Sequence, residues 1–146
     1  MSAATHEEIQ VGPLAIRFLV EGRASGGSVA VFEFDVPAGA KLPVAHSHDA
    51  YEETVYGLRG TVSWTIEGDV LEAGPGDAVC IPRGAVHRFD NQGAEDATVL
   101  AIVTPGLLGP DYFRELAAVV GAASGGPPDP AEIGAVMLPH VLTPAP

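Results

Sequence analysis

Cysteine is scarce in this chain of 146 residues, and Cys80 is the only one. A single thiol cannot form a disulfide within the chain, so nothing in the sequence requires an oxidising compartment. Positive charge is scarce as well: seven Lys and Arg stand against 19 Asp and Glu, and the formal net charge is −12. A surface this acidic repels phosphate groups, so we expect neither nucleic acid nor an anionic membrane as a partner.

Long apolar runs are also missing. No run approaches the roughly 20 residues that cross a bilayer. The first ten residues, MSAATHEEIQ, lack the basic stretch and apolar run of a secretory signal. We therefore expect a cytoplasmic protein. The hydrophobic content of 47% is too high for a disordered chain and sufficient for a core, so we expect one domain over residues 1–146.

What the sequence does contain is a series of short apolar runs with turn residues between them. Gly and Pro, 18 and 13 in number, occupy many of the separators. The pattern predicts strands at 15–20, 28–36, 44–48, 53–58, 61–67, 78–81, 86–90 and 97–103. Short strands at this regular spacing are typical of an all-β sandwich or barrel, with a core over about 28–104.

After residue 104 the pattern becomes helical. Pro110 follows Gly109 at a position suited to the first turn of a helix, and Asp129 precedes Pro130 as an N-cap would. Apolar residues then recur at helical spacing in both segments. We expect a short C-terminal helical tail over about 109–139 that packs on the outside of the barrel. A lid over a functional site is the alternative.

Three histidines and one glutamate occupy positions that suit a metal site. His46 and His48 are two apart on a predicted strand, so their side chains share one face, roughly 6–7 Å apart. The next strands can bring Glu53 and His87 to the same interior. Three imidazoles and a carboxylate suit one divalent transition-metal ion (Fe, Mn, Ni, Cu or Zn) and leave coordination positions open.

The spacing of these residues resembles the two motifs of the cupin family. Gly39, His46-Ser47-His48, Glu53 and Gly60 match the first motif, Gly-x₅-His-x-His-x₃₋₄-Glu-x₆-Gly, except that six residues instead of five follow Gly39. Gly76, Pro82-Arg83-Gly84, His87 and Asn91 match the second, Gly-x₅-Pro-x-Gly-x₂-His-x₃-Asn, at every position. Fifteen residues separate the motifs, as in small bacterial members.

The resemblance implies a cupin barrel, that is, a double-stranded β-helix or jelly roll, with the metal inside. It implies His46, His48, Glu53 and His87 as ligands, and a structural role for Asn91. It also gives Glu53 the role of a catalytic general base. A homodimer is implied as well.

Several single residues have more than one interpretation. Glu52 competes with Glu53, but neighbours on a strand face opposite sides, and the gap to Gly60 favours Glu53. Cys80 is expected to be a small core residue. The tyrosines at 51 and 56 are expected to serve in packing. Core residues that share a face with the site could also line a substrate pocket; these are Trp64, Ile66 and Phe89.

Three functions fit these features. The first is a metal-dependent oxygenase of the dioxygenase type, acting on a small aromatic or enolisable organic substrate. The second is a non-redox cyclase, isomerase or lyase that uses the metal as a Lewis acid. The third is a non-enzymatic metal or ligand sensor, which the lack of a DNA-binding helix pair or basic patch disfavours. The barrel alone does not choose among them.

Overall fold

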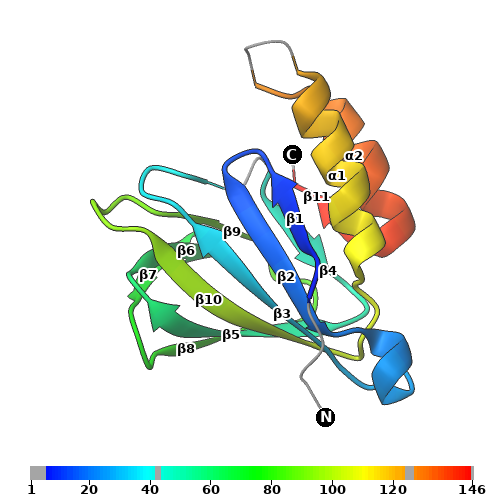
Figure 1. Ribbon diagram of the computed structural model, residues 1–146, viewed down its shortest axis with the longest axis horizontal. Helices are drawn as coiled ribbons and strands as arrows, with labels where there is room; N and C mark the ends of the chain where they lie inside the picture. The colour runs from blue at the N-terminus through cyan, green and yellow to red at the C-terminus, as the bar shows by residue number, and fades with distance from the viewer. Residues whose placement is uncertain (1–5, 42–43, 124–126, 146) are drawn as a thin grey trace.

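The computed structural model describes residues 6–41, 44–123 and 127–145, and it consists of two antiparallel sheets with helices at one side (Figure 1). The first sheet has the order β1 (Glu8–Val11), β2 (Leu14–Val20), β3 (Ala30–Val36), β10 (Ala97–Thr104), β5 (Glu52–Arg59) and β8 (Ala78–Ile81). The second has the order β11 (Leu142–Pro144), β4 (His46–His48), β9 (His87–Asp90), β6 (Val62–Ile66) and β7 (Asp69–Ala73). The predicted all-β class is confirmed.

The core lies on the facing sides of these sheets. Strands β3 and β10 alternate strictly between buried and half-buried residues, and their register sets Phe34 opposite Val99 and Phe32 opposite Ala101, all four buried. Alternation of this kind places every second side chain inside. Polar neighbours such as Asp35 face outward, where Arg17 donates two hydrogen bonds to its carboxylate.

Three strands lie outside the predicted set. Strand β7 carries four exposed residues in a row, so it has no alternating pattern; pairing with β6 across the Glu67-Gly68 turn creates it. Strand β1 forms a hairpin with β2, and β11 pairs with β4. The core position expected for Cys80 is wrong: Cys80 is exposed, whereas Val79 and Ile81 on either side of it are buried.

The C-terminal segment returns to the barrel. Helix α1 (Pro110–Ala122) begins at the predicted proline, and α2 (Pro130–Met137) begins after Asp129, whose side chain accepts a hydrogen bond from the Ala131 amide at 2.9 Å. The two helices lie beside one another along one side of the barrel (Figure 1). A 3₁₀ turn, η2 (Leu138–His140), leads into β11. The tail therefore also supplies a strand. A second 3₁₀ turn, η1 (Gly22–Ser25), connects β2 to β3.

Two motif residues shape the loops around the site. Asn91 is buried and donates to the carbonyls of Val36 at 2.9 Å and Glu95 at 2.7 Å, which ties β9 to the end of β3. Gly60 has φ +67°, and a Cβ there would lie 2.5 Å from the Asp96 carbonyl oxygen, so only glycine fits.

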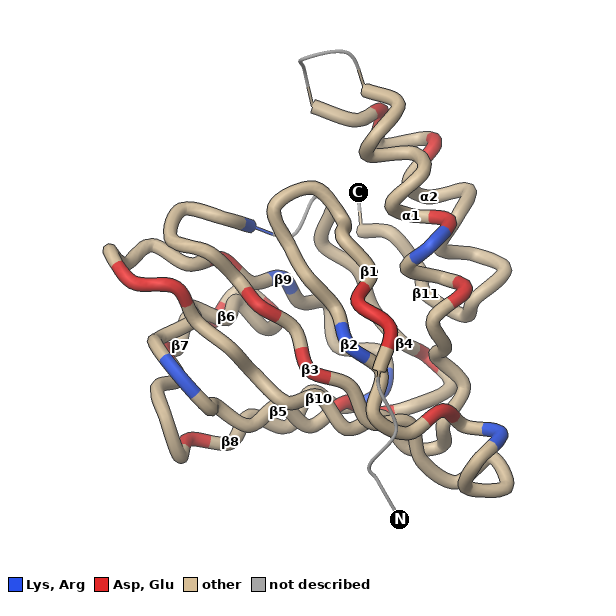
Figure 2. The backbone as a smooth tube through the Cα atoms, in the orientation of Figure 1, with Lys and Arg blue, Asp and Glu red and all other residues tan. Residues whose placement is uncertain are grey.

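Acidic residues outnumber basic ones across the molecule. The Lys and Arg positions of the described residues are scattered along the backbone, while Asp and Glu occur on both sheets and on the helices (Figure 2). No helix in the described part of the chain has the length and apolar character to cross a membrane.

Candidate metal centre

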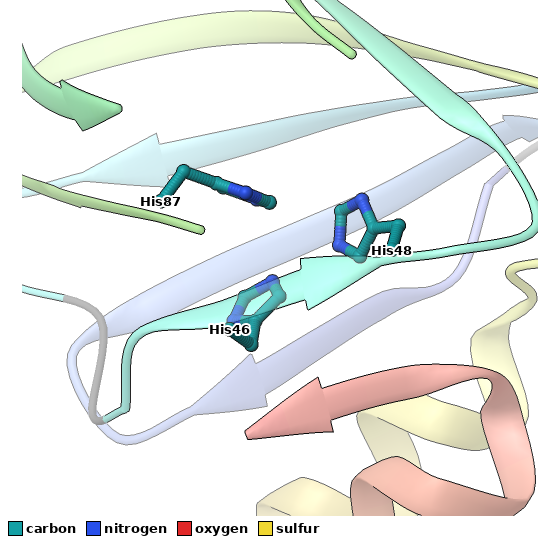
Figure 3. Close-up of side chains that lie close together, drawn as sticks. All are labelled: His46, His48 and His87. Atoms are coloured by element: carbon teal, nitrogen blue, oxygen red, sulfur yellow. The ribbon is translucent and has the colours of Figure 1, made fainter. Parts of the chain in front are cut away.

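His46, His48 and His87 converge in the interior of the barrel (Figure 3). His46 and His48 share one face of β4, and His87 on β9 is the direct cross-strand partner of His46. The three ring centroids are 4.6 to 4.9 Å apart, and one donor atom from each ring lies within 4.8 Å of the others. All three side chains are buried. The three rings form a triangle because His46 and His48, two residues apart on β4, share a face, and because β4 pairs antiparallel with β9, which carries His87.

Backbone carbonyls orient two of the three rings. His46 Nδ1 lies 3.1 Å from the Val44 carbonyl oxygen, and His87 Nδ1 lies 2.9 Å from that of Ala85. A proton on Nδ1 satisfies each carbonyl and leaves the Nε2 lone pair available to a metal. Buried His48 Nδ1 has no hydrogen-bond partner among the described residues, so this ring has an unused nitrogen at the centre. These features fit a bound metal ion.

Burial keeps the imidazoles neutral. Burial, with a smaller effect of the neighbouring imidazoles, lowers the pKa of His46 to about 3 and that of His48 to about 2. The pKa of His87 is lowered as well, again by burial. Neutral imidazole is the form that ligates metals, so the cluster is ready to bind at neutral pH without first losing protons.

Glu53 lies beside this cluster, on β5 of the opposite sheet. Its carboxylate is buried, lines the same cavity as the histidines, and has Oε1 3.9 Å from His48 Nδ1. Its pKa is raised to about 7 by burial. The carboxylate of Glu53 is outside the group of three histidines whose donor atoms lie within 4.8 Å of one another. Glu52 faces the other way, where its carboxylate accepts a 2.6 Å hydrogen bond from Arg83.

A cavity of about 50 Å³ adjoins the four side chains and is mostly apolar. Trp64 and Phe89 line it, whereas Ile66, the cross-strand neighbour of His87, is not among the described lining residues. No lysine or arginine occurs among the described residues of its wall. By the same measure a water needs roughly 10–15 Å³, so the space holds a few waters. The apolar side chains of its wall favour a small apolar ligand.

Part of the cavity wall comes from segments that sequence reasoning placed elsewhere. Helix α1 lies outside the sheets, as expected, yet Tyr112, Phe113 and Leu116 face the cavity, and β11 adds Leu142. The sequence shows the apolar stripe of α1, but it does not show that this stripe packs against the cavity. Tyr51 is fully buried and stacks on His48 with ring centroids 4.6 Å apart, so its packing supports a ring of the cluster.

Comparison with known proteins agrees with this geometry. The family model described as Cupin domain matches residues 32–103. Quercetin 2,3-dioxygenase of Bacillus subtilis is 26% identical over 110 residues, which cover 75% of this chain and 32% of that enzyme. This chain therefore spans about a third of the length of that curated relative.

Two crystal structures have similar folds. One is a sugar phosphate isomerase of the cupin superfamily from Silicibacter pomeroyi, with 26% identity, a TM-score of 0.55, and coverage of 62% of this chain and 59% of that one. The other is a predicted oxalate decarboxylase from Thermotoga maritima, with 21% identity, a TM-score of 0.62, and coverage of 69% and 92%.

Two antiparallel sheets around a cluster of buried histidines define a β-barrel protein with a candidate metal centre inside. Residues 32–103, which hold both histidine motifs, match the family model and form a cupin domain.

Proposed function

We propose that this protein is a metal-dependent oxygenase of the dioxygenase type that acts on a small aromatic or enolisable molecule. The observation that carries the proposal is the position of three buried, neutral imidazoles and a buried carboxylate at the wall of one apolar cavity. Similarity to quercetin 2,3-dioxygenase over three quarters of the chain supports it.

His46, His48, His87 and Glu53 would hold one divalent transition-metal ion. Three nitrogens and one carboxylate oxygen suit Fe, Mn, Ni, Cu or Zn. When bound, such an ion supplies a Lewis acid for a substrate oxygen and, if it is redox-active, one-electron chemistry with O₂. The carbonyls of Val44 and Ala85 hold the rings of His46 and His87 in the ligating tautomer.

Glu53 is the base of the proposed reaction. In the metal-free site burial raises the pKa of its carboxyl group to about 7. A bound cation would lower this pKa and keep the carboxylate ionised, so that it could accept a proton from a substrate hydroxyl or an acidic C–H. Its burial keeps bulk water from competing for that proton. The aromatic side chains of Phe34, Trp64 and Phe89 offer flat apolar surfaces to a ring.

The cavity wall also bears on the choice of substrate. A phosphorylated sugar needs cationic or amide donors for its phosphate, but the described wall residues include no lysine or arginine. An apolar wall of this kind favours an uncharged organic ring. This argues against the substrate of the similar isomerase structure.

A non-redox isomerase or lyase is the second candidate. It is favoured by the 26% identity to the sugar phosphate isomerase and by the ability of Glu53 to move a proton between two substrate atoms. The two candidates differ in their need for O₂ and for a redox-active metal.

One experiment separates them. The protein is purified without an affinity tag or chelator, its metal content is measured by elemental analysis, and Fe-, Mn-, Ni- and Zn-loaded samples are tested for O₂ uptake with flavonols, diketones and catechols. We expect uptake with a redox-active metal and none with zinc.

Glu53→Gln should abolish turnover, whereas Glu52→Gln, one residue away on the outer face, should retain it. Turnover that proceeds with zinc and without O₂ would favour the isomerase or lyase, and no uptake with any metal would refute the oxygenase.

A further inference from the structure

Tyr112 brings a phenol group to the candidate metal centre from outside the barrel. It lies in the first turn of α1, is 2% exposed, and lines the same cavity as Glu53 and the three histidines. Its hydroxyl group makes no hydrogen bond to any described residue, although it lies in an apolar wall. Unlike the Tyr51 hydroxyl, it is not fully buried, so an oxygen atom of a bound ligand can reach it and accept a hydrogen bond.

The ring of Tyr112 is held firmly. Phe113 packs edge-on against it with centroids 4.9 Å apart, and His140 does so from η2 at 5.5 Å. His140 Nε2 in turn contacts the Glu115 carboxylate one turn along α1. The helix and the C-terminal turn thus fix the ring from two sides, and a fixed donor loses little freedom when it binds a ligand.

Tyr51 provides a contrast within the same site. It is fully buried and its hydroxyl also lacks a partner, but its ring stacks on His48 and is not among the described residues that line the cavity. Burial and the nearby Glu53 carboxylate raise the pKa of both tyrosines above the ordinary value, so both phenols keep their protons at neutral pH. Only Tyr112 lines the space that a ligand would occupy.

A second donor of the wall lacks a partner as well. The indole nitrogen of Trp64 is buried without a hydrogen bond to a described residue, and Trp64 lines the cavity from β6, in the sheet that carries the three histidines. Glu53 is the carboxylate in this wall. Two donors of the wall therefore have no partner among the described residues, which favours a ligand whose oxygen atoms accept hydrogen bonds.

We propose that the Tyr112 hydroxyl donates a hydrogen bond to an oxygen of the bound substrate, and that Tyr112 is the residue by which α1 selects an oxygen-bearing aromatic ring over a plain hydrocarbon ring. The inference rests on the proposed function in one respect, since it takes this cavity as the substrate site. It does not depend on the reaction that follows. Binding without turnover therefore tests it separately.

The experiment uses zinc-loaded full-length protein, which binds ligand without O₂ chemistry. Trp64 is the only tryptophan of the chain, so quenching of its fluorescence reports occupation of the cavity. Catechol and benzene are titrated into wild type, Tyr112→Phe and the control Tyr56→Phe, whose side chain is exposed on β5, with zinc content measured in each. We expect Tyr112→Phe to weaken catechol binding about tenfold, the worth of roughly one hydrogen bond. Benzene binding should be unchanged, and Tyr56→Phe should resemble wild type for both ligands.

Equal catechol affinity in wild type and Tyr112→Phe would overturn the proposal. So would a parallel loss of benzene binding, because that would show a packing role. A measurement on the wild type does not depend on the variant folding: the chain has three tyrosines, and catechol should shift the ¹³Cζ NMR signal of Tyr112 where benzene does not. Absence of that shift at saturating catechol would also refute the hydrogen bond. A protein that binds catechol through Tyr112 but consumes no O₂ would support this inference and refute the oxygenase.

Discussion

His46 and His87 are direct cross-strand neighbours on β4 and β9, with their rings edge to face and centroids 4.6 Å apart. The two strands belong to different motifs of the sequence, and their antiparallel register alone brings the rings together. Each ring is fixed by a carbonyl two residues before it in the chain. The geometry of the pair is therefore built from backbone hydrogen bonds, and it leads to several expected outcomes.

Removal of one imidazole should disable metal binding. His87→Ala deletes one corner of the histidine triangle, and we expect metal affinity to fall by more than about 100-fold, beyond the usual cost of losing an outer partner of a ligand. Competition with a chromophoric chelator measures the affinity. His6→Ala, at an exposed histidine, is the control and should match wild type. Full metal content in His87→Ala would contradict the proposed ligand set.

Glu53→Gln should stabilise the metal-free protein at alkaline pH. Because burial raises the folded-state pKa of Glu53 from 4.5 to about 7, the folded state holds its proton more tightly than the unfolded state does. The ionised group therefore destabilises the fold increasingly as pH rises from about 4.5 to 7. Loss of that charge should raise the free energy of unfolding by up to about 3 kcal/mol at pH 8 and by little below pH 4.5.

Urea unfolding at pH 4 and pH 8 in the presence of EDTA measures this difference. Glu52→Gln is the matched control; Glu52 is paired with Arg83 outside the barrel, and its removal should not stabilise the protein at pH 8. An equal free energy of unfolding for Glu53→Gln and wild type at pH 8 would show that the carboxylate carries no burial cost.

The buried histidines should resist protonation in mild acid. Their folded-state pKa values, about 3 for His46 and about 2 for His48, lie below the unfolded value of 6.5. The unfolded state thus binds more protons between these limits, and the stability of the metal-free protein should fall as pH drops from about 6.5 towards 3. Imidazole NMR signals of both residues should remain in the neutral form from pH 8 to pH 5. A midpoint near pH 6.5 for either would show that its ring is solvated.

Gly60→Ala should be much more destabilising than Gly68→Ala. Both glycines have positive φ, +67° and +83°, and alanine pays roughly 1–2 kcal/mol for that conformation at either position. A Cβ at Gly60 would also lie 2.5 Å from the Asp96 carbonyl oxygen, whereas a Cβ at Gly68 meets nothing within 4 Å. We expect a further loss of about 2 kcal/mol for Gly60→Ala in chemical denaturation. Equal losses would mean that the loop before β10 yields to the added methyl group.

Local rules were sufficient for much of the site. The parity of a strand put His46 and His48 on one face and separated Glu53 from Glu52, and the structure places these side chains accordingly. The same parity failed for Cys80, because alternation says which residues share a face but not which face is inside. Ile66 shows a similar limit: it shares the face of Trp64, yet it is not among the described residues that line the cavity.

The sequence by itself determined the barrel class, the turns and the residues of the histidine cluster, because strand periodicity, glycine conformation and motif spacing act over a few neighbouring residues. The tertiary structure decided the rest. Strand β7 exists only through its pairing with β6, Leu142 faces the cavity because β11 pairs with β4, and Tyr112 lines it because α1 packs beside β1. These contacts join segments far apart in the chain, and their free energy depends on the complete arrangement of sheets and helices rather than on any local pattern.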